Sequence, residues 1–244
     1  MENAQETSNV DAYWTNGFPN VEGWVHAGLL PYIKHINRTQ LAGGISGHIA
    51  EIGVFHGKFL IALANLAYPE SKVTALDVFD DQSKNIDGAG VGDLEKLQQN
   101  ISAYGPANLD YAYVKADSSA LTPLEKIELA RDRGPFRLFS VDGCHTTEHT
   151  LGDLQTAQDC LSPGGVIILD DYMQPHWPGV TQAASLFCGS IPRVAPFLYA
   201  HHKLFFVGLG WHSHFYHEVV REFAGQPSAK TVTMFGNSVL SIYP

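Results

Sequence analysis

The stretch VDGCHTTEHTLGDLQTAQDCLSPGGVIILDDY (residues 141–172) holds two acidic positions, each directly after an apolar run. Asp142 and His145 follow the run FRLFSV, and Asp170 and Asp171 follow the run VIIL. Short apolar runs are typical of strands buried in a parallel sheet, and open α/β sheets bind ligands at the carboxyl ends of their strands. We therefore expect these polar side chains at one edge of a sheet, where they can hold a divalent cation.

Apolar runs alternate with helical patterns along most of the chain, which is the signature of βαβ units. This alternation predicts an α/β, Rossmann-like fold: a mostly parallel seven-stranded sheet with helices on both faces and an antiparallel edge. The expected strands are residues 48–54, 71–79, 109–117, 136–142, 166–172, 203–210 and the terminal VLSIYP, and the expected helices are 58–67, 94–104, 151–161 and about 180–188.

The first forty residues do not follow this alternation. They carry Trp14 and Trp24 and a helical pattern over 28–37, and the pair Gly43 and Gly44 marks the start of the regular pattern. We expect an N-terminal cap or lid over residues 1–40 and a main domain over residues 41–244. A helix packed on the outside of the sheet is the alternative for the first segment.

Composition excludes several classes of protein. The chain has 244 residues, a formal net charge of −10 and 45% hydrophobic residues, as in a globular protein with one sizeable core. An acidic chain without clustered Lys and Arg is a poor match for nucleic acid. No signal peptide or bilayer-spanning apolar stretch is apparent, so a cytoplasmic protein without membrane insertion is expected. Three cysteines without CxxC spacing suggest neither a disulfide framework nor a thiolate zinc site.

The first strand-to-helix turn is EIGVFHG (residues 51–57), with Glu51, Gly53 and Gly57. Glycines there let the backbone approach a ligand, but the spacing ExGxxxG differs from the GxGxxG of dinucleotide sites. Asp77 ends the second strand, where a carboxylate can accept both hydroxyls of a ribose. Asp117 and Ser118 end the third strand, within reach of an adenine edge. Either acid can instead be a helix N-cap.

On these residues the chain resembles the class I S-adenosylmethionine-dependent methyltransferases over residues 41–244. The stretch 141–172 is similar to the DGxH … GGxIxxDD pattern of metal-dependent O-methyltransferases that modify sugars on natural products and glycans. The resemblance implies cofactor binding and a Mg²⁺ site, with His145 as general base. The implied cofactor-binding residues are Glu51, Gly53, Gly57, Asp77, Asp117 and Ser118, and the implied metal ligands are Asp142, Asp170 and Asp171.

Physical chemistry is compatible with these roles. Mg²⁺ prefers hard oxygen ligands and leaves positions open, so three carboxylates can anchor it while acceptor hydroxyls complete its shell. An imidazole with a pKa near 6.5 can take the hydroxyl proton close to neutral pH. Singly, however, Asp171 can cap the following turn, Asp142 can accept from backbone N–H groups, and His145 can be an ordinary loop histidine.

Three further segments each allow two interpretations. His176 and Trp177 follow the proposed metal ligands and can form a wall of an acceptor pocket, or simply a rigid loop. Residues 80–93 suit either a mobile lid over the cofactor or disorder. The HSHFYH run (residues 212–217) is expected to be a solvated loop between edge strands rather than a zinc site.

The sequence leaves the acceptor open. A sugar or another small molecule or glycan with adjacent hydroxyls is favoured, and a catechol is the runner-up. A nucleotide-binding module without catalysis is the alternative from another class, although such a module has no need of a base beside a metal. A nicotinamide oxidoreductase is disfavoured because the third glycine is missing. Homo-oligomerisation also remains open.

Overall fold

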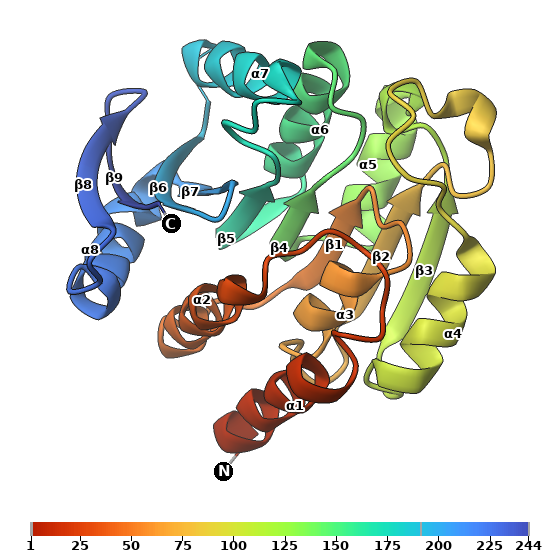
Figure 1. Ribbon diagram of the computed structural model, residues 1–244, viewed down its shortest axis with the longest axis horizontal. Helices are drawn as coiled ribbons and strands as arrows, with labels where there is room; N and C mark the ends of the chain where they lie inside the picture. The colour runs from red at the N-terminus through yellow and green to blue at the C-terminus, as the bar shows by residue number, and fades with distance from the viewer. Residues whose placement is uncertain (1, 191, 244) are drawn as a thin grey trace.

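The computed structural model describes residues 2–190 and 192–243, with side chains from residue 9 onward. Its centre is a sheet with the strand order β3-β2-β1-β4-β5-β7-β6-β9-β8 (Figure 1). The strands are β1 (His48–Ile52), β2 (Lys72–Asp77), β3 (Asp110–Lys115), β4 (Phe136–Val141), β5 (Leu161–Leu169), β6 (Val194–Ala200), β7 (Lys203–Gly208), β8 (Ala229–Met234) and β9 (Asn237–Ile242).

The first five strands are parallel, and the remainder of the sheet is mixed. β7 runs antiparallel to both β5 and β6, β9 is parallel to β6, and β8 is antiparallel to β9. The chain moves outward from β1 to β2 and β3, then returns to place β4 on the other side of β1. This reversal is a topological switch point, where open α/β sheets bind ligands at the carboxyl ends of their strands.

Eight α-helices cover the described sheet on both faces. Side chains of α2, α3, α4 and α8 contribute to one core cluster, and those of α6 and α7 to the other, with α5 residues packed against the second. The helices are α1 (Glu2–Asn16), α2 (Leu30–Ala42), α3 (Lys58–Ala64), α4 (Leu94–Tyr104), α5 (Pro123–Asp132), α6 (Thr147–Asp159), α7 (Pro178–Gly189) and α8 (His212–Phe223).

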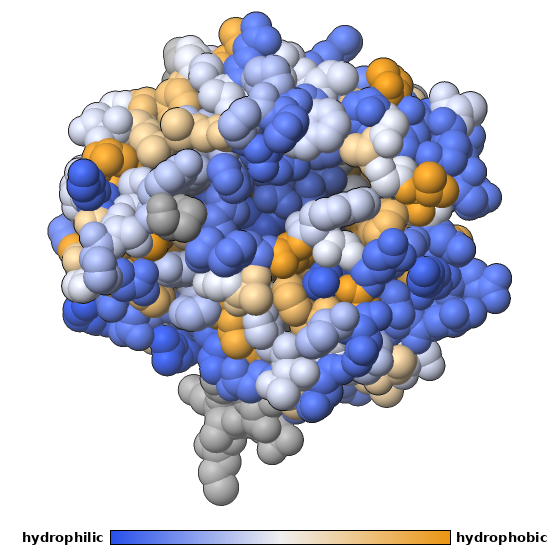
Figure 2. All heavy atoms as spheres, in the orientation of Figure 1, coloured by the Kyte–Doolittle hydropathy of each residue, from blue (hydrophilic) through white to orange (hydrophobic). Residues whose placement is uncertain are grey.

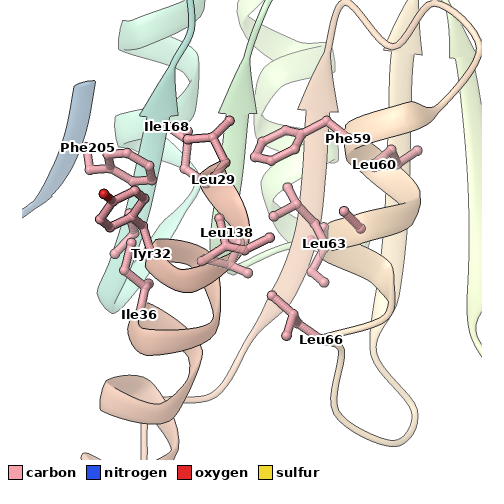
Figure 3. Close-up of a cluster of buried hydrophobic side chains, with 14 of the residues drawn as sticks. Leu29, Tyr32, Ile36, Phe59, Leu60, Leu63, Leu66, Leu138, Ile168 and Phe205 are labelled. Atoms are coloured by element: carbon pink, nitrogen blue, oxygen red, sulfur yellow. The ribbon is translucent and has the colours of Figure 1, made fainter. Parts of the chain in front are cut away.

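The N-terminal segment lies against the first of these faces. Tyr32 and Ile36 of α2 point toward Phe205 and Ile168 of the sheet, beside the leucine-rich face of α3 (Figure 3). α1 contacts α3, and the Tyr13 hydroxyl donates to the Lys58 carbonyl at 2.8 Å. Burial of these apolar side chains fixes the segment on the domain.

The predicted fold class is confirmed, with three differences in detail. The described sheet has nine strands rather than seven, because β6 and β8 were not predicted. α5 was also not predicted. The HSHFYH run is not a loop but the start of α8, whose Phe215, Val219 and Phe223 are buried. These three residues recur every fourth position, so the helical periodicity was present in the sequence but was masked by the histidines around them.

The loop between β2 and α4 (residues 78–93) is ordered by internal contacts. Asn85 Nδ2 donates to the Gly90 carbonyl at 2.7 Å, and Gln82 Nε2 donates to the Phe79 carbonyl at 2.7 Å. A short 3₁₀ turn spans Gln82–Lys84. Within the described part of the chain, no helix combines the length and the apolar character needed to cross a membrane.

Candidate functional site

A cavity of about 490 Å³ opens at the carboxyl ends of the parallel strands, a size common for small-molecule sites. Figure 2 shows a hollow with hydrophilic residues near the centre of the molecule. Eight of the ten site residues predicted from the sequence line the cavity, whereas Glu51 and Gly57 do not. The eight are Gly53, Asp77, Asp117, Ser118, Asp142, His145, Asp170 and Asp171.

Gly53 lets β1 and β4 end in close contact. Its φ is +79°, and a Cβ atom there would lie 1.8 Å from the Asp142 carbonyl oxygen. Gly57 has a different steric role, because it is the N-cap of α3 with a φ of +89° and a Cβ there would meet Leu97 at 2.4 Å. Both positions therefore require glycine, but only Gly53 does so at the cavity wall.

Asp77 holds the glycine loop in place. Its Oδ2 accepts from the backbone N–H groups of Val54 and Phe55 at 2.6 and 2.8 Å, and its Oδ1 accepts from Phe79 N–H at 2.6 Å. A carboxylate has about four lone-pair sites, so Asp77 keeps capacity for one more donor at the cavity. Its predicted ribose contact thus has to share this carboxylate with the loop.

Asp117 and Ser118 form the far wall of the cavity. Asp117 is the N-cap of a 3₁₀ turn, and its Oδ1 accepts from the Ser119 backbone N–H at 2.9 Å and hydroxyl at 2.7 Å. The helix-cap alternative considered from the sequence is therefore present, on a residue that also faces the cavity.

Glu51 lies beneath the site rather than in it. It is 2% exposed and lies beside Ser140 and Lys203. Burial raises the pKa of Glu51 to about 8, although the nearby Lys203 ammonium opposes this shift. The predicted cofactor contact of Glu51 would have to be indirect.

The three predicted metal ligands meet at the ends of β4 and β5, together with a lysine from β7. Lys203 is 1% exposed, and its Nζ lies 2.6 Å from Asp170 Oδ2 and 4.0 Å from Asp142 Oδ2. Burial and the neighbouring Asp170 raise the pKa of Asp142 well above its usual range. Burial also acts on Asp170, but the ammonium outweighs it and lowers the pKa of Asp170.

His145 lies between two carboxylates. Its Nε2 is 3.0 Å from Asp171 Oδ2, and its Nδ1 is 2.7 Å from Asp87 Oδ2. Trp177 stacks on the ring, with centroids 4.2 Å apart and an interplanar angle of 17°. Burial alone would lower the pKa of His145, but the hydrogen bonds with Asp171 and Asp87 outweigh it and raise the pKa.

The donor set suits a divalent cation. Asp142, His145 and Asp171 each offer a ligand atom, and these atoms all lie within 4.8 Å of one another. Two carboxylate oxygens match the preference of Mg²⁺ for hard oxygen ligands. Asp170 pairs with Lys203, and its role as a metal ligand stays a prediction.

The opposite wall comes from the N-terminal segment and the β6–β7 hairpin. Trp24 and His26 line the cavity with His201 and His202, and the rings of His26 and His201 stack with centroids 3.9 Å apart. His201 and His202 form the two-residue turn with φ values of 49° and 61°, a left-handed conformation that is uncommon for residues other than glycine and in which Asn, Asp and His are enriched. Burial, aided by the neighbouring histidines, lowers the pKa of His201.

Comparison with known proteins identifies the family. Residues 50–172 match the model of a family described as a methyltransferase domain, and this match spans half of the chain. The chain belongs to this methyltransferase family. The fold and the class of enzyme expected from the sequence are thereby confirmed, and S-adenosylmethionine is the methyl donor that the family implies.

Solved structures share the fold of this methyltransferase. The O-methyltransferase NovP has a TM-score of 0.58 at 15% identity, over 73% of this chain and 80% of NovP. The TDP-rhamnose 3'-O-methyltransferase CalS11, an enzyme in calicheamicin biosynthesis, has a TM-score of 0.56 at 17% identity, over 85% of this chain and 94% of CalS11.

A third similar structure is MycE from the mycinamycin biosynthetic pathway, in complex with Mg, SAH and mycinamycin VI. Its TM-score is 0.53 at 17% identity, over 83% of this chain and 54% of MycE. No curated protein matches the chain.

Several cavity residues of the methyltransferase were not predicted from the sequence: Trp24, His26, Asp87, His149, His201 and His202. Lys203, which contacts the site from behind, was also missed. Asp87 had a detectable signal, since it is an acid in a glycine-rich segment of the loop proposed as a lid. Lys203 had none, because it reads as the polar start of an apolar strand.

Proposed function

We propose that this methyltransferase transfers a methyl group from S-adenosylmethionine to a hydroxyl of a sugar or another vicinal-diol small molecule, aided by a divalent cation. The observation that carries the proposal is the placement of His145. Its Nε2 faces the cavity edge 3.0 Å from Asp171, in the same cavity as Gly53 and Asp77. The same cavity therefore contains the proposed base, a cluster of carboxylates and space for a molecule the size of the cofactor.

The cofactor fits the end of the cavity formed by β1, β2 and β3. Gly53 keeps side-chain atoms away from that wall, and Asp77, Asp117 and Ser118 offer oxygen acceptors along it. The cavity is rich in carboxylates, which favours a cationic sulfonium. The sulfonium carries its own leaving group, so the protein has mainly to align the donor with the acceptor oxygen.

Asp142 and Asp171 are the residues that would hold Mg²⁺ or another hard divalent cation, with His145 adjacent. When bound, such a cation would orient a hydroxyl and make it more acidic. Asp170 would contribute to the field of the site through its pair with Lys203 rather than as a free ligand. The presence of Mg in the MycE complex supports this assignment.

His145 would accept the proton of the hydroxyl. Nδ1 lies 2.7 Å from Asp87 and Nε2 lies 3.0 Å from Asp171 on the cavity side, so Nε2 is the nitrogen that would receive the proton if Asp171 bound the cation. Transfer of the methyl group from sulfur to that oxygen then breaks the S–CH₃ bond and leaves S-adenosylhomocysteine.

The acceptor would lie between Trp177 and the wall of Trp24, His26, His201 and His202. Imidazoles held neutral can both donate to and accept from hydroxyl groups, and the lowered pKa of His201 keeps it in that form. Indole rings supply faces for the C–H surface of a sugar. The substrate in the name of CalS11, TDP-rhamnose, supports a sugar acceptor.

The test uses purified protein, S-adenosylhomocysteine titration calorimetry and transfer of a radiolabelled methyl group to an acceptor panel containing TDP-rhamnose, simple methyl glycosides and catechol. We expect S-adenosylhomocysteine to bind and at least one diol to be methylated in the presence of Mg²⁺. His145→Gln should retain S-adenosylhomocysteine affinity but lose about 100-fold or more of the transfer rate.

His217→Gln is the matched control, because His217 is exposed on α8 away from the cavity. It should behave as wild type. A protein that does not bind S-adenosylhomocysteine, or a His145→Gln variant that transfers methyl groups at the wild-type rate, would contradict the proposal.

A further inference from the structure

Asp87 connects the loop between β2 and α4 to the histidine of the site, across 58 residues of sequence. One oxygen, Oδ2, accepts from the His145 backbone N–H at 2.8 Å and lies 2.7 Å from His145 Nδ1. The other oxygen accepts from the Ala89 backbone N–H at 3.0 Å, within the loop itself. Asp87 therefore bonds to its own loop and to His145 at once.

This contact is shielded from solvent. The side chain of Asp87 is 10% exposed and that of His145 is 12% exposed. Burial opposes ionisation of Asp87, but the N–H groups of His145 and Ala89 outweigh it and lower the pKa of Asp87. An ionised carboxylate can only accept, so the His145 Nδ1 opposite it must carry the hydrogen.

The same loop also forms a wall of the cofactor cavity. Gln82, Lys84, Asn85, Ala89 and Gly90 line it together with Asp87. A Cβ atom on Gly90 would lie 3.2 Å from Phe55 and 3.3 Å from Trp24, so the loop packs between the glycine turn and the N-terminal segment. The loop that carries Asp87 is therefore also part of the cavity wall.

We propose that Asp87 is a positioning residue that fixes the orientation of the His145 ring as a base. This inference rests on the proposed function of His145. Asp87 holds the ring with Nδ1 toward itself, which leaves Nε2 on the side of Asp171 and the cavity. Without the Asp87 carboxylate, the ring loses its partner at Nδ1 and can turn away from this orientation.

A role for Asp87 in the loop structure alone would require only the hydrogen bond within its own loop. The bond to Ala89 N–H alone closes a turn of the kind that aspartate commonly makes. It does not require a second acceptor aimed at a ring nitrogen of a distant residue. With Trp177 on its face and Asp171 at Nε2, the His145 ring is fixed on three sides, and Asp87 supplies the side that belongs to a loop.

The experiment compares Asp87→Ala and Asp87→Asn with wild type, each saturated with S-adenosylhomocysteine and labelled with ¹⁵N-histidine. The ring signals of His145 are assigned by their absence from the His145→Gln spectrum. In wild type we expect Nδ1 to carry the hydrogen, and in Asp87→Ala we expect the signals to shift to a mixture of tautomers. Methyl transfer should fall by about 10- to 100-fold in Asp87→Ala, with S-adenosylhomocysteine affinity within twofold of wild type.

Asp80→Ala is the matched control, because Asp80 lies in the same loop but pairs with Lys115 at the surface. Its His145 signals and transfer rate should match wild type. Unchanged His145 signals in both Asp87 variants would overturn the inference. Loss of S-adenosylhomocysteine binding in both would also overturn it, because Asp87 would then serve the loop structure alone.

The outcomes separate this inference from the proposed function. If His145→Gln is as active as wild type, the proposed base is wrong. If His145→Gln is inactive while Asp87→Ala has the wild-type rate and the wild-type His145 signals, only the role of Asp87 is wrong.

Discussion

The ammonium of Lys203 lies 2.6 Å from the carboxylate of Asp170, although the two residues come from strands that run in opposite directions. The register explains the contact. Leu169 pairs with Leu204, so the residue after β5 and the first residue of β7 meet at the same sheet edge. Lys203 Nζ also lies 4.5 Å from the centre of the Phe59 ring. A fixed cation is therefore built into the base of the carboxylate cluster.

Replacement of Lys203 by Met tests this relationship. The change keeps the length of the side chain but leaves Asp142 and Asp170 close together without their cation. Removal of one partner from a buried pair costs about 3–5 kcal/mol, and we expect that loss in the free energy of unfolding, measured with urea. Lys230→Met, at an exposed position on β8, is the control and should change stability by less than about 0.5 kcal/mol. Equal effects of the two substitutions would show that the ion pair does not stabilise the fold.

Removal of the divalent cation should separate catalysis from cofactor binding. In the proposed assignment Asp142 and Asp171 would hold the cation beside His145, whereas Gly53 and Asp117 line the part of the cavity assigned to the cofactor. EDTA should therefore reduce methyl transfer at least tenfold while S-adenosylhomocysteine affinity, measured by calorimetry, stays within twofold. Added Mg²⁺ should restore the rate.

Substitution of Asp171 tests its assignment as a metal ligand. Asp171→Asn should weaken Mn²⁺ binding, followed by electron paramagnetic resonance, by at least tenfold, which corresponds to about 1.4 kcal/mol. Asp132→Asn, at the exposed end of α5, should leave Mn²⁺ binding unchanged. Full transfer activity in EDTA together with unchanged Mn²⁺ binding in Asp171→Asn would remove the metal from the mechanism.

The parallel half of the fold was predictable because its signals are local. Strands β2, β4 and β5 are short apolar runs that lead into an acid, at Asp77, Asp142 and Asp170, and this pattern locates the edge at which the polar side chains meet. Helix α4 was predicted with the bounds that the structure gives it, since its Leu97 and Ile101 recur at helical spacing between Asp93 and Gly105.

The remainder of the site depends on long-range contacts that no local pattern reveals. Lys203 reaches Asp170 only because β7 inserts antiparallel beside β5, and the sequence of β7 does not encode its neighbour. Asp87 contacts His145 through the fold of the loop between β2 and α4. Trp24, from the N-terminal segment, lines the same cavity. Strand β8 was missed because alternating exposed residues on an edge strand carry little apolar signal.

Glu51 should make stability depend on pH. Its pKa is about 8 in the folded protein against 4.5 as its ordinary value, so its contribution to the free energy of unfolding is greatest below pH 4.5 and is lost as the pH rises toward 8. Glu51→Gln has no proton to lose. Wild type should therefore weaken relative to Glu51→Gln on the order of 1.4 kcal/mol per pH unit across this window.

Urea unfolding of both proteins at several pH values between 5 and 8 measures this difference. The other titratable groups are the same in the two proteins, so their effects on the free energy of unfolding cancel in the comparison. Glu70→Gln, at an exposed turn, is the control and should track wild type at every pH. A constant difference between wild type and Glu51→Gln would mean that Glu51 is ionised throughout, with Lys203 as its partner.

The final prediction concerns the contact between the glycine loop and β4. Gly53 and Gly44 both have positive φ angles, +79° and +63°, so alanine at either position incurs a similar backbone strain of about 1 kcal/mol. They differ in space, because a Cβ on Gly53 would lie 1.8 Å from the Asp142 carbonyl oxygen, whereas a Cβ on Gly44 would meet nothing within 4 Å. Gly53→Ala must therefore push the end of β1 away from the end of β4, which moves Asp142 from its place beside Lys203. We expect Gly44→Ala to lower the free energy of unfolding by about 1 kcal/mol and to keep activity, and Gly53→Ala to lower it by at least about 3 kcal/mol and to lose both S-adenosylhomocysteine binding and methyl transfer. Similar losses of stability in the two variants would show that the strands can separate at Gly53 without cost, and that the site does not depend on their close approach.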